Sequence, residues 1–184
     1  MAGWLILIVI LVVLAVWFVS VYNALVRMRN QADNAWSQID VQLKRRHDLI
    51  PNLVEVVKDY MSYEKEVLEN VTKARASAAG ATTVAQSAQA EGVLSSALGR
   101  LFAVMENYPQ LKANQNVGQL QEELASTENK ISFARQFYND SVMNFNNRLQ
   151  VIPNNVVASL CSFKPKDLFT VPETDKEVPK ADLR

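Results

Sequence analysis

The feature that most constrains this chain is an uncharged apolar run near its N-terminus. From Trp4 to Tyr22 the sequence reads WLILIVILVVLAVWFVSVY, with Ser20 as its one aliphatic hydroxyl. About 20 such residues, at ~1.5 Å per residue, cross the hydrocarbon core of a bilayer as an α-helix. A cleaved signal peptide is the alternative, but it requires a basic segment before the apolar run, and MAGW has no basic side chain. The run therefore predicts a retained transmembrane anchor over residues 1–22.

The residues beside this run predict how the anchor lies in the membrane. Trp4 near one end, and Trp17 and Tyr22 near the other, suit the aromatic belts of the two interfaces. Arg27 and Arg29 follow within two helical turns, where each contributes about 1 kcal/mol with anionic lipid. All basic side chains come after the run. The positive-inside bias therefore predicts that the N-terminus is outside and the rest of the chain is cytoplasmic.

An apolar stripe at helical spacing continues beyond the run, and no cluster of Gly, Ser or Pro separates the two. The stripe consists of Trp36, Ile39, Leu43, Ile50, Leu53, Val57, Tyr60, Val67, Val71 and Ala74. Steps of three and four residues, or their sums, place these side chains on one helix face. The rhythm continues through Pro51, so we expect a kink there and not the end of the helix. The pattern predicts one long helix from the anchor to about Ala79.

The remaining segments predict shorter helices and a second long one. Ala76–Gly92 is small and polar and predicts a turn, and Val93–Asn107 predicts a short amphipathic helix that Pro109 ends. Apolar positions from Val117 to Phe145 keep a strict three-four rhythm and predict the second long helix. We expect a last short helix over Asn154–Leu160.

Together these segments predict an all-α protein. Its N-terminal transmembrane helix is expected to continue into an antiparallel long-helix bundle of the four-helix type, over residues 23–162. The tail, residues 163–184, combines prolines with mixed charges, so we expect it to be extended or disordered. Phe163 and Phe169 are candidates for docking part of this tail on the bundle.

A charged cluster just before Pro51 contains Lys44, Arg46, His47 and Asp48, and His47 is the only histidine. Arg46 falls on the apolar stripe, and Pro51 removes the backbone donor for the His47 carbonyl. Lys44 and Asp48 have ordinary i,i+4 helix spacing, worth only about 0.2–0.5 kcal/mol. We interpret the cluster as a structural polar layer at a kink, not as an acid/base site. We expect donors of His47 and its neighbours to help satisfy the freed carbonyl.

A buried Arg46 requires an acidic partner, because an unpaired buried charge is strongly destabilising. The expected partner is Glu128, or another acid on the second long stripe. Arg135 is expected to pair in turn with Asp40 or Asp48.

Asparagines gather near the end of the second long stripe. A polar helix face is one reading. The other is that Asn139 and Asn146, seven residues apart, form a hydrogen-bonding strip that sets register or contacts another subunit.

The sequence gives no positive evidence for catalysis or for a cofactor. One histidine and one cysteine do not supply a zinc site, and haem ligation by His47 with a methionine has no attachment motif behind it. Cys161 lies in the apolar segment VVASLCSF, where a thiol is usually inert. The paired acids Glu122 and Glu123 suit a solvated helix face. No catalytic, cofactor-binding or metal-binding residue is predicted, and no small-molecule substrate is evident.

The charge balance bears on partners. Lys+Arg 19 against Asp+Glu 19 gives a formal net charge of +0, and no basic excess of the kind that binds nucleic acid is present.

Several separated phrases resemble the bacterial LemA family. They are YNALVRMRNQADNAWSQIDVQLKRRHDLIPNLVEVVKDY, LFAVMENYPQLKANQN, LQEELASTENKISFARQFYNDSV and FNNRLQVIPNNVVASL, in this order. The resemblance implies a single-pass protein of the bacterial inner membrane with a cytoplasmic bundle of long antiparallel helices. It implies no established enzymatic activity, and it suggests partners in membrane stress and protein quality control.

The sequence thus leaves two non-enzymatic hypotheses, with an enzyme as the reading we set aside. The first is a homo-oligomeric scaffold that organises partners or lipid at the inner membrane. The second is an adaptor that presents clients to a membrane protease or sensor. The lipid bilayer and further copies of the chain are the expected partners.

Overall fold

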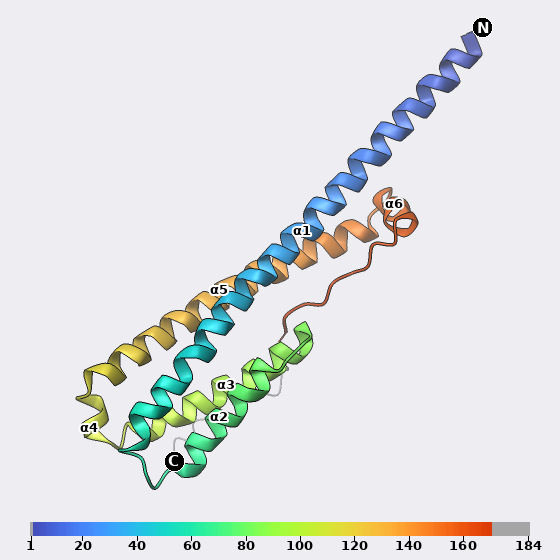
Figure 1. Ribbon diagram of the computed structural model, residues 1–184. Coiled ribbons are helices and arrows are strands. Elements are labelled where there is room, and N and C mark those ends of the chain that lie inside the picture. The colour runs from blue at the N-terminus through green and yellow to red at the C-terminus, as the bar shows by residue number, and fades with distance from the viewer. Residues whose placement is uncertain (1, 171–184) are drawn as a thin grey trace, which may run out of the picture. The chain divides into compact units, whose positions relative to one another are not determined.

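The computed structural model describes residues 2–170, and every regular element in this range is an α-helix. The helices are α1 (Ala2–Lys58), α2 (Lys65–Ala79), α3 (Val84–Met105), α4 (Pro109–Lys112), α5 (Gln115–Gln150) and α6 (Asn154–Leu160) (Figure 1). The predicted all-α class is confirmed.

The chain folds into two compact units. Among the described residues, the anchor unit comprises 2–38 and 134–168, and the hairpin unit comprises 39–133 and 169–170. The two long helices, α1 and α5, each contribute residues to both units. Within the hairpin unit α2 and α3 pack against each other as a helical hairpin (Figure 1).

Helix α1 changes character along its length. Its apolar N-terminal part is exposed, from Trp4 at 75 % exposure to Val19 at 54 %. Among the described residues, α1 is the one helix that is long and apolar enough to cross a membrane. Regular burial begins at Val21 and Leu25. The helix continues without a break through Pro51, as the rhythm of its stripe predicts.

The prediction that this first helix reaches Ala79 is wrong. It ends at Lys58, and Tyr60 N and Met61 N both donate to the Val57 carbonyl to form a turn. Met61 is fully buried, whereas Tyr60, the predicted stripe residue, is 45 % exposed. Val57 and Met61 are four residues apart, so the apolar rhythm continues across the turn and does not mark the end of the helix.

Two further boundaries differ from the predictions. The segment Ala76–Gly92 is mostly helical, because α3 begins at Val84 and not at Val93. A reciprocal capping box starts α3: Gln86 N donates to Thr83 Oγ1 at 3.2 Å, and Thr83 N donates to Gln86 Oε1 at 3.3 Å. Pro109 begins α4, where its missing N–H costs nothing, and does not end the preceding helix.

The C-terminal helices follow the sequence pattern closely. Helix α5 spans the predicted stripe, and α6 has the predicted bounds Asn154–Leu160. Residues 163–170 have no regular secondary structure, as expected of an extended tail, and Phe169 is 2 % exposed. The remainder of the predicted tail, 171–184, lies outside the described residues.

Each unit has its own hydrophobic core. The core of the hairpin unit includes Ile50, Leu53, Leu94, Leu101 and Leu124. The core of the anchor unit is formed by Val21, Leu25, Phe145, Leu149, Val157 and Ala158. Trp17, Phe18 and Phe163 are partly buried against this second core.

Candidate functional site

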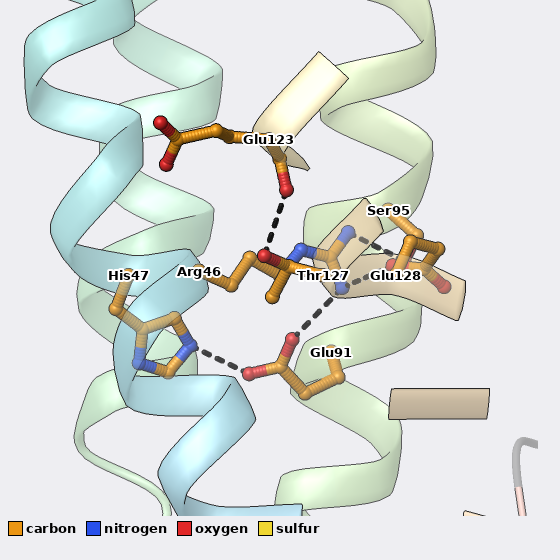
Figure 2. A network of polar contacts seen from close by, with 7 residues as sticks. All are labelled: Arg46, His47, Glu91, Ser95, Glu123, Thr127 and Glu128. Carbon is orange, nitrogen blue, oxygen red and sulfur yellow. Dashed lines mark hydrogen bonds and ion pairs between the residues drawn. The ribbon is translucent and has the colours of Figure 1, made fainter. Parts of the chain in front are cut away.

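A group of polar side chains lies around two buried charges in the hairpin unit. This polar layer consists of Arg46 and His47 from α1, Glu91 and Ser95 from α3, and Glu128 from α5 (Figure 2). Arg46 and Glu91 are 4 % and 5 % exposed, so two formally charged residues lie in the interior.

Arg46 is held by three side chains at once. Its Nη1 lies 2.9 Å from Glu128 Oε2 and 3.2 Å from Glu91 Oε2, and its Nη2 donates to Ser95 Oγ at 2.9 Å. Figure 2 shows the guanidinium between these groups. Because the rigid fork of arginine donates in several directions in one plane, it links α1 to α3 and α5 simultaneously.

Glu91 receives a second donor from α1. His47 Nε2 lies 2.6 Å from Glu91 Oε1, so each carboxylate oxygen of Glu91 has its own partner (Figure 2). A buried carboxylate is tolerated only when it is paired and hydrogen-bonded in this way. The acid therefore binds two consecutive residues of α1.

The carbonyl freed by Pro51 is satisfied by a different helix. Proline has no N–H, so the His47 carbonyl, four residues earlier, has no partner within α1. Arg75 of α2 donates to this oxygen from Nε at 2.8 Å. The expected donors near His47 do not perform this role, and the actual donor is 28 residues further along the chain.

The structure brings together only part of the predicted cluster. Glu128 does pair with Arg46, but its side chain is 50 % exposed, and the fully buried partner is Glu91. Lys44 and Asp48 form no ion pair in the range 2–170.

The predicted pairing of Arg135 with Asp40 or Asp48 would join residues of the two units, and it stays a prediction. Asp40 directly follows the buried Ile39 and is exposed, so its carboxylate lies off the buried face of α1.

Sequence reasoning misses Glu91 because the composition of its segment predicts a turn. A signal is nevertheless present in the sequence: stepping back three residues from Leu94 along the stripe Leu94, Leu98 and Leu101 reaches Glu91. A charged residue at a stripe position of one helix predicts an opposite charge at a stripe position of another, and Arg46 is that charge.

A second polar arrangement holds the tail in the anchor unit. Asn146 donates from Nδ2 to the Lys166 carbonyl at 2.8 Å, and Lys166 N donates to Asn146 Oδ1 at 2.9 Å. Lys166 Nζ also lies 2.6 Å from Asp33 Oδ1. We call Asn146, Lys166 and Asp33 the tail clamp. The structure thus gives Asn146 an intrachain role, and Asn139 also has an interaction of its own. The contact of these residues with another subunit stays a prediction.

Tyr138 adds a neutral contact next to this clamp. Its hydroxyl donates to the Asp167 carbonyl at 2.8 Å, and its ring lies 5.4 Å from that of Trp36. Burial, and to a smaller extent the nearby carboxylates of Asp167 and Asp33, raise the pKa of Tyr138 above its ordinary value.

The predicted anchor residues occupy the start of the same unit. Tyr22 and Phe163 make an edge-to-face ring contact at 5.8 Å, and the Arg29 guanidinium lies 5.6 Å from the centre of the Phe163 ring. Arg27 is exposed, and Trp17 is partly buried against the core.

The chemistry available to the polar layer is limited by its internal pairing. Its carboxylates and cations bind each other, so the layer offers no unpaired nucleophile or base. Residues 2–170 contain no group of three or more His, Cys, Asp or Glu side chains that could hold a metal ion. The groove between α2 and α3 is lined by Glu66, Lys73 and Arg100 among others and includes no residue of the polar layer.

Comparison with known proteins gives a consistent match. The model of the LemA family matches residues 35–183. Protein LemA of Metamycoplasma hominis is 27 % identical over 91 % of this chain and 77 % of that protein. Magnetosome protein MamQ of Magnetospirillum gryphiswaldense is 24 % identical, and MamQ 1 of Paramagnetospirillum magneticum is 25 % identical, each over 80 % of this chain. The chain spans 64 % of the length of these two magnetosome proteins.

None of these names states an enzymatic activity. Because the family model covers most of the chain, including the polar layer and α6, this chain belongs to the LemA family.

Proposed function

We propose that this protein is a non-enzymatic, membrane-anchored helical scaffold that assembles with copies of itself at the bacterial inner membrane. The observation that carries the proposal is α1, in which an exposed apolar segment and a segment of the buried core belong to one unbroken helix, Ala2–Lys58. No flexible linker separates the anchor from the folded part of the chain.

The anchoring rests on the surface of α1. Large apolar side chains from Trp4 to Val16 are at least 50 % exposed, and water is an unfavourable environment for so continuous an apolar surface. The basic residues Arg27 and Arg29 come directly after the apolar segment, which supports a cytoplasmic location for the helical bundle.

The scaffold role rests on how the polar layer uses its charges. Arg46, Glu91 and Glu128 hold three helices together and leave no reactive group for a substrate. Arg75 and the His47 carbonyl fasten a fourth helix to the same region of α1. Such a set of bonds favours one defined arrangement of helices over a pliable one, which is a property that a positioning protein requires.

Self-association rests on an exposed aromatic pair. Phe133 and Phe137 lie four residues apart on one side of α5, and they are 73 % and 45 % exposed. Aromatic side chains are enriched in the buried parts of protein interfaces, so this face of α5 suits a second copy of the chain.

Light scattering of the full-length protein in mild detergent tests the proposal. We expect a discrete oligomer, and we expect Phe133→Gln with Phe137→Gln to reduce its mass. Val93→Gln, at a position 56 % exposed on α3, is the matched control and should leave the mass unchanged. A strictly monomeric protein at all concentrations would remove the homo-oligomeric scaffold.

The orientation is tested separately by protease protection in sealed inner-membrane vesicles. A cytoplasmic bundle is digested in inside-out vesicles and protected in right-side-out ones. The reverse pattern would overturn the proposed orientation without affecting the scaffold.

A second candidate function is an adaptor that presents clients to a membrane protease or sensor. It is favoured by the tail clamp, which holds residues 163–170 in an extended form that leads into a charged, proline-containing end. Removing residues 171–184 should then abolish copurification with such a partner while leaving the oligomer mass intact. If the truncation instead reduced the oligomer mass and left copurification unchanged, the result would favour the scaffold over the adaptor.

A further inference from the structure

The corner between α5 and α6 exposes apolar side chains that the fold of the anchor unit does not use. We call this surface the apolar corner, and it comprises Val151, Ile152, Val156 and Leu160. These side chains are 52 %, 79 %, 54 % and 71 % exposed. Exposed apolar residues are ordinary when scattered, but four within ten positions of one corner form a patch.

Helix α6 is apolar on two sides. Val157 and Ala158 are buried in the core of the anchor unit, whereas Val156 and Leu160, four residues apart, share the opposite exposed side. A short surface helix in water normally has a polar outer side. The outer side of α6 therefore matches an apolar environment better than water.

The position of α6 identifies that environment. Its buried side packs in the same core as Val21 and Leu25 of α1, with Trp17 and Phe18 against that core. Trp17 and Phe18 belong to the apolar run that spans the membrane in the proposed function. The apolar corner thus lies beside the last turns of that run, within one compact unit.

The charges around the corner support the same partner. Arg148 before it and Lys164 after it are both exposed. Arg29, on α1, lies with its guanidinium over Phe163. Cations that border an apolar patch suit the headgroup region of a bilayer that contains anionic lipid.

We infer that the apolar corner is a second membrane contact. Its side chains insert into the interfacial region of the cytoplasmic leaflet, where the C-terminal end of the membrane span emerges; they are Val151, Ile152, Val156 and Leu160. The contact gives α6 a role in holding the anchor unit against the lipid surface. This inference rests on the proposed membrane anchoring, and a spin-label experiment separates the failure of one from the failure of the other.

The experiment measures the environment of single spin labels on the full-length protein. The one native cysteine is replaced as Cys161→Ser, and a nitroxide is then attached to one of four new cysteines. Ile152→Cys and Leu160→Cys report on the apolar corner. Val9→Cys reports on the anchor, and Val93→Cys is an exposed control on α3, outside both the apolar corner and the aromatic pair of α5.

The protein is placed in nanodiscs of phosphatidylcholine with phosphatidylglycerol, and collisions with oxygen are compared with collisions with a water-soluble nickel chelate. We expect the oxygen-to-nickel ratio at positions 152 and 160 to be several-fold higher than at position 93, and lower than at position 9. The helical circular dichroism signal of each variant shows that the chain is folded.

Two results would overturn the inference. Water-like ratios at both 152 and 160, with a lipid-like ratio at position 9, would leave the anchor and remove the second contact. Low collision with both reagents, together with spin–spin broadening, would show that a second copy of the chain covers the corner. A water-like ratio at position 9 would instead remove the proposed anchoring itself.

Discussion

The two units of this molecule fasten their helices by different physical means. In the hairpin unit, formal charges are buried and neutralise one another, as Arg46 does with Glu91 and Glu128. In the anchor unit, the tail is held by aromatic rings and by the amide of Asn146, and the ion pair between Lys166 and Asp33 lies nearer the surface.

The difference indicates which unit should tolerate single substitutions and which should not. A buried charge that loses its partner costs far more free energy than a neutral hydrogen bond does, because its desolvation is no longer offset. The hairpin unit should therefore be intolerant of single changes in its polar layer. The anchor unit should lose stability in smaller steps.

The largest effect is expected from Glu91→Gln, which keeps the shape of the side chain and removes its charge. It leaves His47 facing a neutral amide and Arg46 with Glu128 as its carboxylate partner, and we expect a loss of about 1.5–3 kcal/mol in the free energy of unfolding. Chemical denaturation of the detergent-solubilised protein, followed by circular dichroism, measures the loss.

Glu123→Gln is the matched control for that change. Glu123 pairs with Arg45 at 3.4 Å, but both side chains are about half exposed, so the same substitution should cost no more than about 1 kcal/mol. Equal losses at Glu91 and Glu123 would show that burial of the layer does not set its energetics.

The next effect concerns Arg75 and Pro51. Arg75→Ala leaves the His47 carbonyl without a donor, and we expect it to destabilise the protein by about 1–3 kcal/mol. Pro51→Ala restores an N–H to α1 that can satisfy the same oxygen. The cost of Arg75→Ala should therefore be smaller in the Pro51→Ala background, and a double-mutant cycle measures the difference. Additive losses would mean that the Arg75 bond does not compensate for the proline.

A smaller effect is expected in the anchor unit from Asn146→Ala. The change removes both hydrogen bonds to Lys166, which are neutral and partly buried, and should cost about 1–2 kcal/mol. Hydrogen exchange of residues 164–168 should accelerate, whereas the hairpin unit should be unaffected. Asn147→Ala, at the exposed neighbouring position, is the control. Unchanged exchange in the tail would contradict the tail clamp.

The smallest effect is a pH dependence at Tyr138. Because the pKa of Tyr138 is raised in the folded protein, the unfolded chain loses this proton first as the pH rises above about 10. The stabilisation that the neutral Tyr138 hydroxyl contributes is therefore fully present below the pKa of the unfolded chain. It is lost as the pH rises through the pKa of Tyr138 in the folded protein. The stability difference between the native protein and Tyr138→Phe should shrink between pH 9 and about 11. A constant difference in melting temperature over this range would contradict the assignment.

The sequence is most informative where one periodic pattern decides the outcome. The apolar run and the stripes of α1 and α5 predict the class and the long helices, because spacing of three and four residues determines a helix face. The bounds of α6 follow from its flanking residues.

The wrong predictions have two physical causes. The turn after Lys58 is missed because Val57 and Met61 keep helical spacing across it, and the early start of α3 is missed because it depends on the Thr83 cap in a segment of weak periodicity. Glu91 lies in that segment, and Arg75 is a polar residue beside the stripe position Ala74. A polar residue in such a segment is recognised as a partner only when the position of its own helix is known.

The proline of α1 has a consequence beyond its own carbonyl. Along an ordinary α-helix every turn has the same backbone chemistry, so a neighbouring helix finds no polar group that distinguishes one turn from the next. Pro51 leaves one oxygen available, and Arg75 binds that oxygen. The hairpin of α2 and α3 is thereby given a single preferred setting along the axis of α1, and a slip by one turn would leave both the oxygen and the guanidinium without a partner.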